Sequence, residues 1–132
     1  MSVTLSETLL VALGGAGGAV VRFLVQQSQL CSVKTYNTMI VNLAGCLLIG
    51  IVWALFMRFQ APGWLSRLVV AGFLGGFTTF SAFALDVVAM SGDGRLREAL
   101  VYLSLSVIGG VALCLAALKA TTAILNTIAP QP

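Results

Sequence analysis

The sequence contains no histidine, and its three cysteines form no metal-binding or redox motif. Histidine is the most common proton shuttle and transition-metal ligand, so its absence argues against a catalytic centre built on imidazole. Cys31, Cys46 and Cys114 form no Cys-x-x-Cys pair. Cys46 and Cys114 lie inside apolar runs, where cysteine behaves as a small hydrophobic residue. Since no cofactor motif is present either, we predict that the protein is not an enzyme.

Charged residues are also scarce. They make up 8% of the 132 residues, whereas soluble proteins carry about 25%. Apolar residues reach 59% of the chain, and the mean hydropathy is +1.05. These values predict an integral membrane protein whose main surroundings are the lipid bilayer. The net charge of +3 comes from scattered basic residues, so we expect no nucleic-acid partner.

Four apolar runs are long enough to cross a membrane, which takes roughly 20 apolar residues. They predict spans at about 8–25, 38–57, 68–90 and 99–124, with short polar connections between them. We therefore expect an all-α membrane protein with a single four-helix transmembrane domain over residues 1–132. The N-terminal stretch lacks an early basic region and its apolar segment is too long for a signal peptide, so we expect none to be removed.

The basic residues do not indicate a clear orientation in the membrane. One side holds three of the seven, Arg58, Arg67 and Lys119, and the other side holds the remaining four, Arg22, Lys34, Arg95 and Arg97. Lys and Arg normally gather on the cytoplasmic side. Either another feature sets the orientation, or the chain inserts both ways and forms an antiparallel two-fold homodimer. Small residues spaced four apart, such as Gly14 and Gly18, favour close helix association and hence an oligomer.

The centre of the third span reads GGFTTFSAF, residues 75–83. Consecutive glycines weaken a helix, and threonine hydroxyls can bind the backbone groups that a break would release. A break at this depth is tolerated only where protein or a wet cavity surrounds it. Its free carbonyls can then coordinate a cation and its free amides favour an anion. The alternative is an intact helix with packed glycines and threonines bonded to the preceding turn.

Polar side chains inside the spans are neutral donors, which favours an anion over a cation. The aromatic rings of Phe80 and Phe83, three residues apart, share one helix face, and a ring edge is electropositive; the alternative is packing or lipid contact. Arg22 is expected to reach the interface or to line an anion-attracting vestibule. Asp86 is either a functional intramembrane acid or the partner of an arginine. The neutral donors are Asn42, Thr79, Ser81, Tyr102 and Ser106.

The motif GGFTTFSAF resembles the third-helix signature of the Fluc/CrcB fluoride channels, usually GGxTTFSTF. GGAGGAVVRF at residues 14–23 and NTMIVNLAGCLLIG at residues 37–50 resemble the first- and second-helix patterns of the same family, so the resemblance runs over the whole chain. It implies a dual-topology homodimer in the bacterial inner membrane, with two antiparallel pores for passive export of cytoplasmic fluoride and hence fluoride resistance.

The resemblance also implies roles for individual residues. Phe80 and Phe83 match the phenylalanines whose ring edges contact fluoride, and Asn42 matches the pore asparagine. A hydroxyl track is implied for Thr79, Ser81, Tyr102 and Ser106, and a vestibule position for Arg22. The backbone carbonyls of Gly75 and Thr78 match those that bind a structural sodium ion at the dimer interface.

Four positions depart from the usual family pattern, and two other functions compete with a fluoride channel. Ala82 replaces a threonine, Cys46 a serine, Asn37 a glycine, and Asp86 stands where glutamate is frequent. A small multidrug transporter needs a central carboxylate, but Glu7 lies outside the expected first span and Asp86 near the end of the third. A membrane subunit without transport activity of its own is the second alternative.

Overall fold

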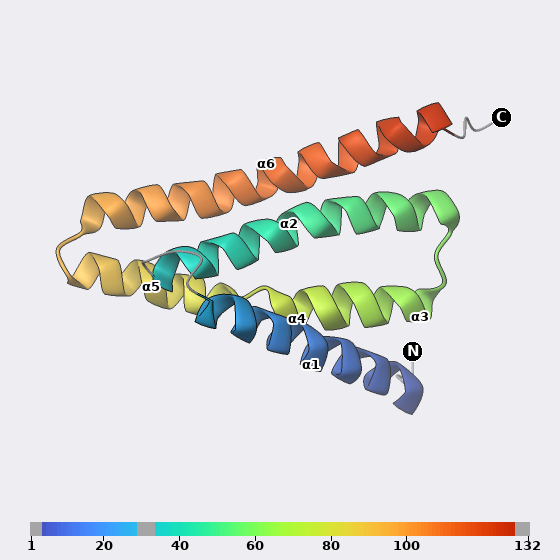
Figure 1. Ribbon diagram of the computed structural model, residues 1–132, viewed down its shortest axis with the longest axis horizontal. Helices are drawn as coiled ribbons and strands as arrows, with labels where there is room; N and C mark the ends of the chain where they lie inside the picture. Colours follow the sequence, from blue (N-terminus) through green and yellow to red (C-terminus); the bar gives the residue numbers. More distant parts are fainter. Residues whose placement is uncertain (1–3, 29–33, 129–132) are drawn as a thin grey trace.

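The computed structural model describes residues 4–28 and 34–128, and in this part the chain forms four long helical segments packed side by side (Figure 1). They are α1 (Leu5–Gln27), α2 (Lys34–Phe59), a composite third segment, and α6 (Leu96–Ile128). Successive segments run in opposite directions (Figure 1). The four stretches Leu5–Gln27, Thr35–Phe59, Gly63–Gly92 and Leu96–Ile128 are long and apolar enough to cross a membrane, which confirms the predicted multi-pass helical protein. Cys31 lies outside the described residues.

Each helical segment extends a few residues beyond its predicted span, because polar residues that hydropathy leaves out continue or cap the helices. The side chain of Thr4 accepts a hydrogen bond from the amide of Glu7, and the carboxylate of Glu7 accepts one from the amide of Thr4. This reciprocal pair satisfies two free amides at the start of α1. Glu7 also forms an ion pair with Arg67 at 2.7 Å, which ties the start of α1 to the third segment.

The third segment is a chain of short helices and not one continuous helix. It comprises α3 (Gly63–Ser66), the π-helix η1 (Arg67–Leu74), α4 (Gly75–Phe77) and α5 (Phe80–Gly92). Thr78 and Thr79 between α4 and α5 are extended, with φ/ψ of −82°/157° and −148°/113°. The predicted break at the centre of this span is therefore confirmed, and the alternative of an intact helix is wrong.

Glycines allow α1 to lie directly against the third segment. A Cβ atom on Gly14 would lie 2.9 Å from the amide nitrogen of Phe73, and one on Gly18 would lie 2.8 Å from that of Phe77. On the other side, a Cβ atom on Gly76 would lie 2.9 Å from the Cα atom of Gly15. These separations leave no room for side chains, as expected for small residues spaced four apart in membrane helices.

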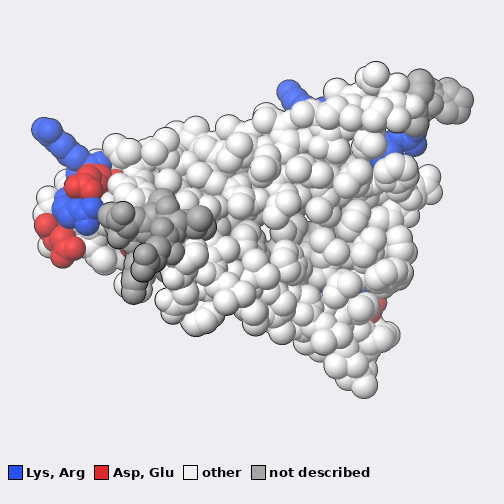
Figure 2. Space-filling view, in the orientation of Figure 1, with Lys and Arg blue, Asp and Glu red and all other residues white. Residues whose placement is uncertain are grey.

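The remaining contacts place α2 in the middle of the bundle. α6 packs mainly against α2, and α1 packs mainly against η1 and α4. A small buried cluster, formed by Phe83, Met90, Ala99 and Tyr102, joins α5 to α6. Most of the outer surface is apolar. The charged side chains visible in Figure 2 lie mostly at the two ends of the molecule, and one basic side chain projects from the upper edge between them. An apolar flank between charged ends matches the profile of a bilayer.

Candidate functional site

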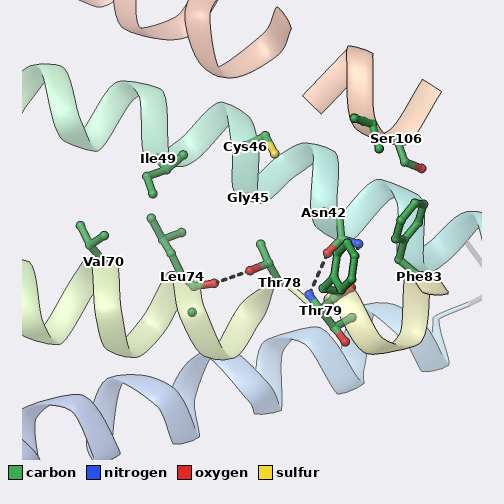
Figure 3. A pocket seen from close by; sticks show the side chains of 13 residues that line it. Asn42, Gly45, Cys46, Ile49, Val70, Leu74, Thr78, Thr79, Phe83 and Ser106 are labelled. Carbon is green, nitrogen blue, oxygen red and sulfur yellow. Dashed lines mark hydrogen bonds between the residues drawn. The ribbon is translucent and has the colours of Figure 1, made fainter. Parts of the chain in front are cut away.

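A pocket of about 390 Å³ opens on the surface of the chain beside the break in the third segment (Figure 3). Its walls come from α2, α6 and both sides of the break. It brings together seven of the residues to which the sequence assigned a role: Asn42, Gly75, Thr78, Thr79, Phe80, Phe83 and Ser106. The other lining residues are Gly45, Cys46, Ile49, Val70, Leu74 and Val107.

Asn42 on α2 holds the extended backbone at Thr79. Its Oδ1 atom accepts a hydrogen bond from the amide of Thr79 at 2.8 Å, and its Nδ2 atom donates one to the carbonyl of Thr79 at 3.0 Å. One hydrogen of the Asn42 amide is thus used within the chain, and the second is left for another acceptor. Because Asn42 lines the pocket, that acceptor can be a bound anion.

The threonines at the break replace backbone hydrogen bonds that a continuous helix would make. The hydroxyl of Thr78 donates to the carbonyl of Leu74 at 3.0 Å. Thr79 caps α5, since its Oγ1 atom accepts a hydrogen bond from the amide of Ala82 at 3.3 Å. A hydroxyl residue at this cap position typically stabilises a helix by about 1 kcal/mol. The same Oγ1 atom lies 3.3 Å from the Oγ atom of Ser81.

The break also frees backbone carbonyls at the end of α4. In a continuous helix the amide of Thr79 would bind the carbonyl of Gly75, but here that amide binds Asn42. The carbonyl of Gly76 instead accepts a hydrogen bond from Nε of Arg22 on α1, at 3.1 Å. Gly75 and Thr78 both line the pocket. Carbonyls freed at a helix break are a type of group that can coordinate a cation.

The two phenylalanines of the motif differ in exposure. Phe80 is 79% exposed, whereas Phe83 is only 7% exposed. Their ring centroids lie 5.6 Å apart with the rings tilted by 51°. The ring of Phe83 stacks on that of Tyr102, also with centroids 5.6 Å apart. Phe83 is thus held by its neighbours, while Phe80 lies on the open side of the pocket in the single chain.

Ser106 contributes a buried hydroxyl with no partner. Its Oγ atom has no hydrogen bond in the part of the chain that the structure describes. Several other hydroxyls on the helices donate to the carbonyl four residues before them, as Ser91 does to Val87 and Thr122 to Leu118. An unbonded buried hydroxyl costs about 1–3 kcal/mol. Because Ser106 lines the pocket, its unpaired hydroxyl is a candidate hydrogen-bond donor to a bound ligand.

Three residues with predicted roles do not line this pocket. Tyr102 is buried behind Phe83, and its hydroxyl donates to Oδ2 of Asp86 at 3.1 Å. Among the described residues, Asp86 has this tyrosine partner and not the arginine considered from the sequence. Ser81 is exposed beside Thr79, and Arg22 binds the carbonyl of Gly76.

Several features of the site could not be read from motifs. A Cβ atom on Gly45 would overlap the methyl group of Thr78, so Gly45 is what lets the break approach α2. Cys46 lines the pocket in place of the usual serine and adds a sulfur atom where a hydroxyl was expected. Asn37 is buried, and its Nδ2 atom donates to the carbonyl of Ser28. In the sequence, the spacing of Asn42, Gly45 and Cys46 places them on one face of α2, and this pattern could have indicated the pocket wall.

The pocket as a whole presents neutral donors, ring edges and free carbonyls, and none of its lining residues carries a formal charge. Neutral amide and hydroxyl donors stabilise an anion in a low-dielectric setting without the deep well of a fixed positive charge. A weaker site is compatible with passage, because a conducted ion must be able to leave. The arrangement therefore suits transient binding of a small ion.

Comparisons with known proteins identify the family. Residues 9–118 match the family model described as CrcB-like protein, Camphor Resistance (CrcB). A protein of Rhizobium johnstonii named "Fluoride-specific ion channel FluC" is 39% identical over 127 residues, which cover 93% of this chain and 98% of the relative. Relatives with the same name in Pseudomonas putida F1 and Azotobacter vinelandii are 40% and 44% identical, over 84% and 79% of this chain and 93% and 87% of theirs. The chain therefore belongs to the CrcB-like family, whose relatives are ion channels and not enzymes.

Proposed function

We propose that this protein is a fluoride-selective channel that lets cytoplasmic fluoride leave the cell passively and so gives fluoride resistance. Relatives named as fluoride-specific channels align over most of both chains, which supports this ion over others. Fluoride is small and strongly hydrated, so several donors must replace its water shell. The bacterial inner membrane is the location in which such export would act.

The observation that carries the proposal is the set of unused donors in the pocket. Ser106 has a free hydroxyl and Asn42 one free amide hydrogen, and both face the space beside Phe83. The ring edges of Phe80 and Phe83 would complete the pathway with weak, dry contacts. Thr79, Ser81 and Tyr102 would continue the hydroxyl track, and Arg22 would stand at the vestibule.

The proposed working unit is an antiparallel homodimer with two pores. Two features of the single chain support a dimer: the pocket opens at the surface, and the apolar ring of Phe80 is 79% exposed there. A second copy would cover this ring and close the pocket. The nearly even division of the basic residues between the two sides, three and four, supports insertion in both orientations.

The proposal includes a structural sodium ion at the centre of the dimer, held by the backbone carbonyls of Gly75 and Thr78. These residues fit a cation, because the break removes the helical amide that would bind Gly75 and both residues line the open pocket. One chain offers too few oxygens for a hard cation, and a second copy related by a two-fold axis would double them. A melting temperature of the purified dimer that is no higher in sodium than in potassium would contradict this part of the proposal.

The test is fluoride efflux from liposomes that contain only the purified protein, read with a fluoride electrode, with chloride efflux measured in parallel. We expect rapid fluoride release and little chloride release. A correctly inserted dimer that releases neither ion would contradict the proposal and favour a membrane subunit without its own transport activity. Release that requires a proton gradient would instead favour a coupled transporter.

A further inference from the structure

A second hollow lies between α2 and α6, nearer the C-terminal ends of both helices than the pocket beside the break. It has a volume of about 560 Å³ and is formed by the last turns of α2 and the C-terminal turns of α6. None of the proposed channel residues lines it. Its wall on α2 consists of Trp53, Ala54 and Met57, and its wall on α6 consists of Leu118, Lys119, Thr122, Ala123 and Asn126. We call it the α2–α6 groove.

α2 and α6 are in close contact just before the groove, and larger side chains line α2 where the groove begins. One turn earlier, Gly50 lets α2 meet α6 closely, since a Cβ atom there would lie 2.9 Å from the Cβ atom of Ala117. Three residues later α2 carries the indole of Trp53 in the groove wall instead of a glycine. Trp53 remains 48% exposed and Met57 68% exposed, so the apolar walls of the groove are not filled by this chain.

The groove lies near the end of α2, beside residue types that favour a membrane–water interface. α2 ends at Phe59, and Arg58 beside it carries a positive charge. Both tryptophans of the sequence, Trp53 and Trp64, lie near this end of the bundle and are about half exposed. Tryptophan favours the level of the lipid headgroups. Lys119 is exposed and long enough to place its ammonium group in the same layer.

The charges around the groove favour an anionic occupant. None of the eight described residues that line it is acidic, and Lys119 has no ion pair in the described chain. The acidic side chain at this end, Glu7, is already paired with Arg67. Asn126 adds an amide donor on the turns beyond Lys119. The hydroxyl of Thr122 donates to the carbonyl of Leu118, so it is left as an acceptor.

We propose that the α2–α6 groove binds one anionic phospholipid. The phosphate would contact Lys119 and Asn126, and one acyl chain would lie along Trp53, Met57 and Leu118. Basic pockets between transmembrane helices are known to hold anionic headgroups in this way. The site is independent of the ion pathway, because the two cavities have no lining residue in common.

The experiment uses Trp53 as the reporter. In the Trp64→Phe variant, Trp53 is the only tryptophan of the chain. The purified protein is reconstituted in phosphatidylcholine with a small fraction of phosphatidylglycerol, and either lipid carries bromine on its acyl chains. Bromine quenches tryptophan fluorescence on contact. We expect brominated phosphatidylglycerol to quench Trp53 more strongly than its share of the bilayer predicts, as if its local fraction were about fivefold higher. This enrichment corresponds to the attraction of about 1 kcal/mol that one lysine near a membrane surface exerts on anionic lipid.

Two variants separate the proposed site from general attraction. Lys119→Gln removes the charge of the groove, and Arg97→Gln removes one exposed charge on α6 near the opposite end of the molecule. We expect the enrichment to disappear in the first variant and to persist in the second. Ala123→Leu keeps Lys119 but fills the groove, and it should also reduce the enrichment.

Three outcomes would overturn the proposal. Quenching in proportion to the bulk lipid fraction would show that the groove has no preference for anionic lipid. Equal loss of enrichment in Lys119→Gln and Arg97→Gln would indicate diffuse electrostatic attraction. A Trp53 signal that neither brominated lipid quenches would mean that protein from a second copy covers the groove. None of these readouts depends on fluoride transport.

Discussion

The side-chain amide of Asn42 pairs with both the amide and the carbonyl of Thr79, at 2.8 and 3.0 Å. A residue in mid-membrane with extended backbone would otherwise leave polar groups without partners, at a cost of several kcal/mol each. Through this one side chain, α2 thus supplies the two hydrogen bonds that neighbouring helical turns would otherwise make with the backbone of Thr79. The break in the third segment is therefore held from outside, and its geometry depends on a residue 37 positions away.

The Asn42→Asp variant should conduct fluoride poorly. Aspartate keeps an acceptor for the Thr79 amide, but it loses the Nδ2 donor and places a negative charge in the pocket. A hydrogen bond to a charged group contributes about 1.5–3 kcal/mol, so we expect fluoride efflux from liposomes to fall by about 10- to 100-fold. Gln60→Glu makes the same amide-to-carboxylate change at an exposed position between helices and serves as the control. Equal efflux in wild type and Asn42→Asp would remove Asn42 from the pathway.

The Phe80→Ile and Phe83→Ile variants should lower fluoride efflux while leaving the dimer intact. Isoleucine is apolar but has no electropositive ring edge, and aromatic contacts of this kind contribute about 0.5–1.5 kcal/mol. We therefore expect a loss of about 2- to 10-fold, because 1.4 kcal/mol corresponds to a factor of ten. Phe59→Ile, at the exposed end of α2, is the matched control. Wild-type efflux in both pocket variants would argue against an aromatic pathway.

Replacing Arg22 should reveal whether its hydrogen bond or its charge matters. If Arg22 acts mainly by binding the Gly76 carbonyl at 3.1 Å, Arg22→Ala will lower efflux equally at low and high salt. An attraction exerted on ions in a vestibule would instead be screened, since the Debye length shrinks from about 30 Å at 0.01 M to about 3 Å at 1 M. We expect a loss that persists at high salt. If the loss of efflux instead disappears in 1 M salt, where the Debye length is about 3 Å, the charge of Arg22 acts at a distance.

The glycine contact between α1 and the third segment gives a stability prediction with an internal control. A Cβ atom on Gly18 would lie 2.8 Å from the amide nitrogen of Phe77, whereas one on Gly92 would meet nothing within 4 Å. Gly18→Ala should destabilise the protein by about 1–3 kcal/mol through overpacking. Gly92→Ala should be neutral or stabilising by about 0.5–1 kcal/mol. Thermal unfolding in detergent measures both, and equal melting temperatures for the two variants would contradict the packing described.

Dual topology can be tested with one cysteine on an exposed turn. Asp93→Cys, in a chain whose three native cysteines are changed to serine, places a thiol between α5 and α6. An impermeant maleimide added to intact cells should label about half of the molecules, as expected when the basic residues impose no orientation. The other half should react only after the membrane is opened. Labelling of all molecules, or of none, from the outside would rule out the antiparallel dimer.

The sequence predicted the helical architecture and the position of the break because both depend on local chemistry. Long apolar runs determine membrane spans, and the Gly-Gly-Phe-Thr-Thr stretch contains the residues that weaken a helix and cap its restart. Thr79 does cap α5, at the position the motif indicates. The pocket also gathers Asn42, Phe83 and Ser106, which lie on three different helical elements.

Other features were not predictable, because they depend on which side chains meet across helices. Periodicity cannot show that η1 is a π-helix, since apolar residues there fit α- and π-helical turns alike. Nor does it reveal that Tyr102 binds Asp86, sixteen residues earlier on another helix. Arg22 was expected at an interface or vestibule, and only the packing of α1 shows that Nε reaches the carbonyl of Gly76.

The lining of the pocket beside the break has a consequence for cells growing in acid. None of its lining side chains is a carboxylate, imidazole, amine or guanidinium, so acidification changes the charge of none of them. A channel of the proposed design has no acid-operated switch in the lining of this pocket. Under the proposed function, fluoride export would therefore continue when external acidity drives more fluoride into the cell.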